Sequence, residues 1–104
     1  MTRQTELSEN SGTIRLRLYI AGHAPNSARA LTNLEPICEE YGKDRFEIDV
    51  IDVLDDPLRA LEDRVLVTPT LIKLSPEPVI QIAGDLSRRY DVLHALGLTP
   101  WNVG

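Results

Sequence analysis

The chain of 104 residues has little cysteine, no long apolar run and a shortage of positive charge. Its single cysteine, Cys38, excludes an internal disulfide and a cysteine-rich metal site. No apolar run could span a bilayer, and the amino-terminal residues lack the charged and then apolar pattern of a secretory signal. We therefore expect a cytoplasmic protein that does not enter a membrane.

The charge balance and the scattered polar residues exclude several classes of site. Eleven basic and 16 acidic residues give a formal charge of −5, which argues against an overall nucleic-acid-binding surface. The six glycines are scattered singly, so no phosphate-binding loop is present. His23 and His94 lie far apart in the sequence, and strand alternation separates the aspartates of residues 49–56. We predict no metal and no cofactor.

The first half of the chain shows one strand and one helix. Residues 1–12 are polar, show no periodicity and are interpreted as a flexible tail. Residues 13–21 alternate between apolar and polar side chains, which indicates a strand. Apolar residues then recur at helical spacing, at Leu31, Leu34, Ile37, Cys38 and Tyr41. Pro36 lies inside this pattern, so we expect a kink or a break just before it.

The second half predicts two helices and three strands. Residues 46–54 form a strand whose two faces both look largely covered. Asp56 and Pro57 begin a short helix over residues 58–63. Residues 70–74 and 78–82 are typical of a hairpin. Gly84 and Asp85 open a last helix, whose apolar side comprises Leu86, Tyr90, Leu93 and either Val92 or Leu96.

The resulting order is βαβαββα, an α/β arrangement of the thioredoxin-like kind. The first two strands, joined by a long helix, should form a parallel pair with a right-handed crossover. We expect one domain over residues 13–98, followed by a short tail at 99–104 that carries the only tryptophan.

A thioredoxin-like redox enzyme needs a thiolate where its first helix begins, because the helix dipole lowers the thiol pKa there. Residues 23–27 contain no cysteine, and Cys38 lies more than two turns further along the apolar stripe, where we expect a buried free cysteine and not a reactive thiol. Ser27 could replace the thiol as in glutathione-dependent enzymes, but we prefer Asn26 or Ser27 as a helix cap. We therefore predict no catalytic residue and no enzyme.

Pro69, between Thr68 and Thr70, stands where thioredoxin-like proteins place a cis-proline. Because only about 5–6% of X–Pro bonds in folded proteins are cis, this hypothesis depends on the fold and not on the residue alone.

Three stretches of the chain resemble the KaiB family of circadian-clock proteins. They are LYIAGHAPNSARAL (18–31), IDVLDDP (51–57) and EDRVLVTPTLIKLSPEPV (62–79), with IAGDLS (82–87) following the third. The similarity runs collinearly over about residues 14–98.

The resemblance implies a non-catalytic regulator that binds a KaiC-type ATPase, with KaiA or a clock histidine kinase as further partners. It also implies two folds, since the family has a tetrameric ground state that differs from the thioredoxin-like monomer in the second half of the chain. By position, it implies five partner-binding residues: Arg29, Phe46, Asp63, Arg64 and Asp85. The alternatives are a solvated face for the two arginines, a core role for Phe46 and a helix cap for Asp85.

The end of the last predicted helix favours the thioredoxin-like form over the ground-state fold. Typical members have Gly-Leu-Asp where this chain has Ala95-Leu96-Gly97. Alanine is favoured over glycine inside a helix by about 1 kcal/mol, and glycine suits the position just past a helix end. We therefore expect mainly a monomer, with the homotetramer as the alternative. Pro36 and the tail Thr99-Pro100-Trp101 also depart from the family, which leaves a divergent paralogue in stress response, with another partner, as the alternative function.

Overall fold

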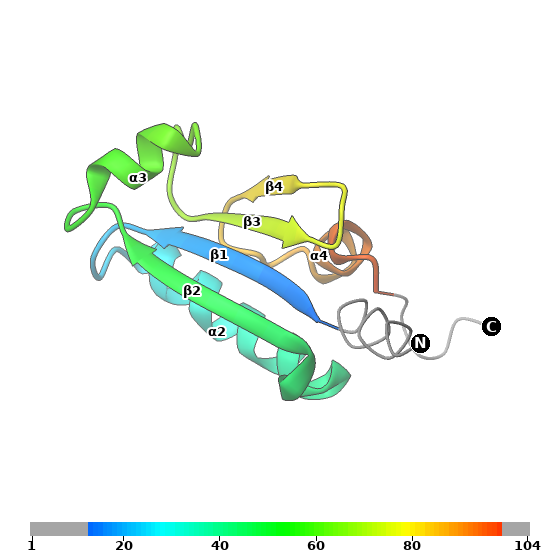
Figure 1. Cartoon of the computed structure of the whole chain (residues 1–104). Helices are drawn as coiled ribbons and strands as arrows, with labels where there is room; N and C mark the ends of the chain where they lie inside the picture. The colour runs from blue at the N-terminus through cyan, green and yellow to red at the C-terminus, as the bar shows by residue number, and fades with distance from the viewer. Residues whose placement is uncertain (1–12, 99–104) are drawn as a thin grey trace.

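The computed structural model describes residues 13–98 as one four-stranded sheet with helices on both faces (Figure 1). The predicted tails at 1–12 and 99–104 lie outside the described residues. The elements follow the predicted order, with one short 3-10 turn added. They are β1 (Ile14–Ile20), α2 (Pro25–Tyr41), η1 (Lys43–Arg45), β2 (Phe46–Asp52), α3 (Pro57–Glu62), β3 (Thr70–Ser75), β4 (Ile80–Ala83) and α4 (Arg89–Leu96).

The sheet has the strand order β2-β1-β3-β4. β1 pairs in parallel with β2, from Ile14 opposite Phe46 to Ile20 opposite Asp52, as the connecting helix predicts. β1 pairs antiparallel with β3, and β3 with β4, so the predicted hairpin is confirmed. This order leaves β2 and β4 as the two edges of the sheet.

The helix α2 does not break at Pro36, so of the two expected outcomes, a kink or a break, the break is wrong. The helix runs from Pro25 to Tyr41 with the proline inside it. Because proline has no N–H, Pro36 cannot donate the helical hydrogen bond to the carbonyl of Thr32. Both residues lie on the exposed side of the helix. Water can hydrate that carbonyl. The buried side, which includes Ala30, Leu34 and Ile37, continues through the proline.

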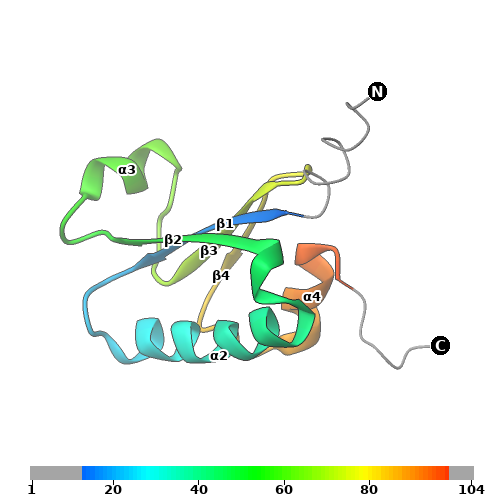
Figure 2. The same ribbon diagram turned by 60° about the horizontal axis from the view of Figure 1, so that its bottom comes forward.

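Figure 2 shows α2 and α4 together on one face of the sheet and α3 on the opposite face. The larger core fills the space between the sheet and the helix pair, with Leu18, Ile37, Leu71 and Leu93 at most 1% exposed. The smaller core lies under α3, where Ala60 packs with Tyr19 and with other apolar side chains of the sheet. The helix pair α2 and α4 therefore covers much more of its face of the sheet than α3 covers of the opposite face.

The predicted end of α4 is confirmed. The helix includes Ala95, and Gly97 adopts the left-handed conformation at φ 79° that ends it. The N–H of Leu98 then donates to the carbonyl of Leu93 at 2.8 Å. The Thr68–Pro69 peptide bond is cis, as predicted, and so are Ser75–Pro76 and Glu77–Pro78, for which we made no prediction.

Three other expectations are wrong. Because β2 is an edge strand, its apolar side chains Ile48 and Val50 are 40% and 44% exposed instead of covered. The last helix begins at Arg89 and not at Gly84-Asp85, because Leu86 has φ 64° and cannot join a right-handed helix. Tyr90, expected on the apolar side, is 71% exposed.

Candidate functional site

The turn between β1 and α2, where a redox enzyme of this fold would place its nucleophile, offers no reactive group. α2 begins after Ala24 with no side-chain cap, so the predicted capping by Asn26 or Ser27 is wrong. Ser27 is 1% exposed, and its Oγ accepts a hydrogen bond from the N–H of Ala21 at 3.0 Å. The serine hydroxyl therefore closes the end of β1 and is not presented to a substrate.

Cys38 is 6% exposed on the buried stripe of α2, as predicted. Burial, with a smaller contribution from the charge of Glu35, raises the pKa of its thiol to about 11. Because the thiolate is the nucleophilic form, this cysteine is unreactive near neutral pH. Residues 13–98 also contain no group of three or more potential metal ligands, and none of their helices is long and apolar enough to cross a membrane.

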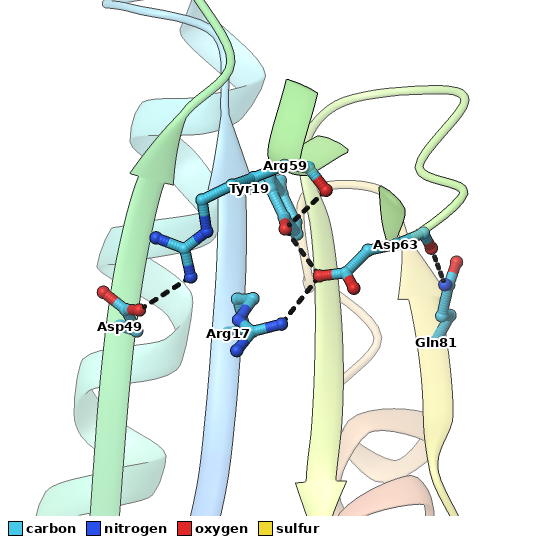
Figure 3. A network of polar contacts seen from close by, with 6 residues as sticks. All are labelled: Arg17, Tyr19, Asp49, Arg59, Asp63 and Gln81. Atoms are coloured by element: carbon cyan, nitrogen blue, oxygen red, sulfur yellow. Dashed lines mark hydrogen bonds and ion pairs between the residues drawn. The ribbon is translucent and has the colours of Figure 1, made fainter. Parts of the chain in front are cut away.

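Asp63 lies at the end of α3 and holds that helix to the sheet (Figure 3). Its Oδ2 accepts hydrogen bonds from the hydroxyl of Tyr19 at 2.5 Å and from Nη1 of Arg17 at 2.8 Å. Its carbonyl accepts a bond from Nε2 of Gln81 on β4 at 2.9 Å. We call these four residues the Asp63 cluster. The single proton of the Tyr19 hydroxyl is shared with the carbonyl of Arg59, whose oxygen lies 3.1 Å from the hydroxyl oxygen. The carboxyl end of α3 is therefore tied to β1 and β4.

The charges in the Asp63 cluster stabilise one another. Desolvation is the largest influence on the Asp63 carboxyl and raises its pKa, but the hydrogen bonds from Tyr19 and Arg17 and the charges of Arg17 and Arg59 outweigh it and hold the pKa below its usual value. Burial, followed by the bond to Asp63, raises the pKa of Tyr19 to about 12. The hydrogen bond to Asp63 likewise raises the pKa of Arg17. The aspartate therefore stays ionised and the phenol protonated over the physiological range.

Arg29 and Asp85, predicted separately as partner contacts, lie together. Nε of Arg29 and Oδ2 of Asp85 are 3.8 Å apart, and the Arg29 side chain is 56% exposed. Asp85 is not the cap of α4: its Oδ1 accepts from the N–H of Ser87 at 3.0 Å, and its carbonyl accepts from Nδ2 of Asn33 at 2.8 Å. This pair links α2 to the loop before α4 and leaves much of the arginine accessible.

The other predicted positions are spread over the molecule. Arg64 is exposed directly after Asp63, with φ 59°. Phe46, at the start of β2, is half-buried and packs against the larger core. The five positions therefore do not form one cluster: Arg29 joins Asp85, Asp63 and Arg64 adjoin α3, and Phe46 stands apart on the sheet edge.

The structure also exposes a group of leucines that the sequence analysis did not single out. Four lie in the segment that includes α3 and its flanking turns: Leu54, Leu58, Leu61 and Leu66, with exposed fractions of 71%, 67%, 68% and 91%. We call these four residues the leucine surface. The available signal was the helical phase of α3, since Ala60, which faces the sheet, lies out of phase with Leu58 and Leu61.

The model of the KaiB domain matches residues 17–98, which is most of the chain. The chain belongs to the KaiB family. The circadian clock oscillator protein KaiB of Thermosynechococcus vestitus is 49% identical over 92 residues, which cover 88% of this chain and 85% of that protein. The relatives reported by this comparison are named as clock proteins and not as enzymes.

Solved structures show that the fold of this KaiB-family chain is thioredoxin-like. The amino-terminal domain of Synechococcus elongatus SasA superimposes with a TM-score of 0.68 at 22% identity, covering 88% of this chain and 90% of that one. The Drosophila thioredoxin Deadhead gives a TM-score of 0.66 at 13% identity, covering 89% of each chain. At such identities the likeness concerns the fold alone, and the predicted thioredoxin-like class is confirmed.

Proposed function

We propose that this KaiB-family protein is a non-catalytic regulator that binds a KaiC-type ATPase and modulates its signalling in a clock or clock-like pathway. The observation that carries the proposal is the family match together with 49% identity to a clock oscillator protein over most of both chains. The chemistry of the described residues supports it, because the β1–α2 turn offers a buried serine and no thiol.

The contacts that we assign to the ATPase are those with accessible charge. Arg29 and Arg64 are both exposed, and each lies beside an aspartate that holds its surroundings in place. The free edge of β2 is a further surface, where a strand of a partner such as KaiA or a clock histidine kinase could add to the sheet. Phe46, at the start of that edge, would contribute its exposed part.

Charge reversal at the two arginines tests the assignment. Binding of the KaiC-type ATPase from the same genome, with ATP present, is measured by biolayer interferometry for the wild type and for Arg29→Glu and Arg64→Glu. Each variant should weaken binding about tenfold or more, since like charges placed across an interface cost several kcal/mol. Arg88→Glu is the control for the change of charge, because the Arg88 side chain is 85% exposed and is paired with Asp91 of α4.

The outcomes separate two claims. A wild-type protein that does not bind the ATPase would refute the proposed function. Binding that is retained in both arginine variants would refute the contact residues and leave the function standing. An insulin-reduction assay addresses the enzymatic alternative, and we expect no activity above that of buffer, because the single thiol is buried.

A further inference from the structure

The leucine surface belongs to the segment around α3, and Figures 1 and 2 show that helix at one end of the molecule, on the face of the sheet opposite α2 and α4. In a helix that only covers a core, the largest apolar side chains face inward. In α3 the small Ala60 packs on the sheet, whereas Leu58 and Leu61 are 67% and 68% exposed. Single exposed leucines are ordinary, whereas groups of exposed apolar side chains are typical of interaction surfaces, and four of these leucines lie within thirteen residues.

The backbone under the leucine surface is fixed. Oδ1 of Asp52 accepts hydrogen bonds from the N–H groups of Gly22 and Leu54, at 3.0 and 2.9 Å. A Cβ placed on Gly22 would lie 3.1 Å from Cδ1 of Leu54, so glycine at that turn leaves room for the leucine beside it. At the other end of α3, the Asp63 cluster ties the helix to β1 and β4. The leucines are therefore presented without loss of backbone order on binding.

The charges in this segment indicate the chemistry of the occupant. Arg59 is paired with Asp49 at 3.2 Å, and Asp63 is paired with Arg17. Three carboxylates have no ion-pair partner within residues 13–98, and they are Asp55, Asp56 and Glu62. Arg64 is the exposed basic residue of the same segment. Apolar side chains are thus bordered by an excess of negative charge.

We infer that the leucine surface receives an amphipathic segment of a protein partner in which lysine or arginine side chains flank the apolar ones. The inference rests on the proposed function and adds to it a docking surface and a partner chemistry. A second copy of this chain fits poorly, because a two-fold contact would place the same carboxylates against each other. An anionic lipid surface would be repelled by them as well.

The test uses paired substitutions at exposed positions, which the fold tolerates. The double variant Leu58→Ser/Leu61→Ser removes the apolar centre of the leucine surface. The double variant Asp55→Lys/Glu62→Lys reverses the charge along its border. Tyr90→Ser is the matched control, because Tyr90 is an exposed apolar residue on α4, 71% accessible and on the other face of the sheet. The first probe is the KaiC-type ATPase. The second and third probes are two designed helical peptides with the same pattern, one made of leucine and lysine and the other of leucine and glutamate.

If the ATPase binds the wild type, the double variant Leu58→Ser/Leu61→Ser should bind at least tenfold more weakly. The double variant Asp55→Lys/Glu62→Lys should bind more weakly at low salt, and the Tyr90→Ser control should stay within twofold of the wild type. If the double variant Leu58→Ser/Leu61→Ser binds the ATPase as tightly as the wild type does, the inference is overturned and the proposed function stays intact.

If the ATPase does not bind the wild type, the proposed function fails and the peptides decide the inference. Shifts of the Leu58 and Leu61 methyl signals with the lysine peptide alone would support the leucine surface. The absence of shifts, equal shifts with the glutamate peptide, or leucine-dependent binding to phosphatidylglycerol vesicles would overturn it.

Discussion

Tyr19→Phe tests whether the Asp63 cluster holds α3 to the sheet. The substitution keeps the ring in the smaller core and removes only a hydroxyl, from a residue that is fully buried. Asp63 then loses one of the two donors to its carboxylate, and the carbonyl of Arg59 loses its hydrogen bond from the tyrosine. The perturbation is therefore polar and leaves the packing in place.

The expected cost follows from the bonds that are lost. A hydrogen bond to a charged group contributes about 1.5–3 kcal/mol, so the free energy of unfolding should fall by about 2 kcal/mol. For a domain of this size, that corresponds to a fall in Tm of roughly 10 °C. Tyr90→Phe is the control, because Tyr90 is 71% exposed, and it should change the free energy by less than about 0.5 kcal/mol.

The Tyr19 hydroxyl also makes the free energy of unfolding depend on pH. The pKa of Tyr19 is raised from 10.0 to about 12 in the folded protein. Because burial disfavours the ionised phenolate in the folded protein, the free energy of unfolding is unaffected by this group below about pH 10. It falls as the pH rises from 10 toward 12. The lowered pKa of Asp63 gives the opposite limb, with stability lost as the pH falls through the acidic range.

Urea unfolding followed by circular dichroism at several pH values measures both effects. Tyr19→Phe should lower the unfolding free energy at pH 7 and flatten its alkaline decline. A variant as stable as the wild type, with the same decline between pH 10 and 12, would refute a stabilising role for the cluster.

Three further predictions concern single positions. Pro36→Ala should raise the free energy of unfolding by about 1–3 kcal/mol in urea melts, because it restores a helix-interior N–H at an exposed position, and an unchanged or lower value would contradict the placement of Pro36 in a continuous helix. Gly97→Ala should cost about 1–2 kcal/mol, because the residue has φ 79°, and thermal melts that match the wild type would contradict the left-handed cap. Cys38 should react with a thiol-specific dye at pH 8 only after unfolding, because its pKa is about 11 and it is buried, so rapid labelling of the native protein would exclude the buried position.

The order of elements could be predicted from the sequence because the apolar periodicity is clear. The alternation at residues 13–21, the helical stripe ending at Tyr41 and the glycine after Leu96 each correspond to a local physical cause that the structure retains. The cis bond at Pro69 could be predicted only through the fold, since the residue alone carries little information.

The errors share a different cause, which is that tertiary surroundings override local patterns. Pro36 is tolerated because its side of the helix faces solvent, and this depends on packing far along the chain. The apolar face of β2 was expected to be covered, but the strand lies at the edge of the sheet, where Ile48 and Val50 remain partly exposed. Periodicity does not say which strand will be the edge.

The sequence allowed partner-binding positions to be proposed one residue at a time, but it did not indicate the contacts that these residues make within the fold. Asp63 and Arg64 were both predicted as partner contacts, yet the aspartate is held by Tyr19 and Arg17 from β1 while the arginine is exposed. Contacts between residues more than forty positions apart produce no local pattern in the sequence. The same holds for Arg29 and Asp85, which were named separately and lie 3.8 Å apart.

We propose that this KaiB-family chain acts by binding a KaiC-type ATPase. Size-exclusion chromatography with light scattering, on the purified protein alone and mixed with the ATPase of the same genome and ATP, tests it most directly. We expect the free protein to elute with the mass of a monomer and the mixture to show it in the peak of the ATPase ring. A mixture in which the two proteins elute separately at micromolar concentrations, with and without ATP, would contradict the claim.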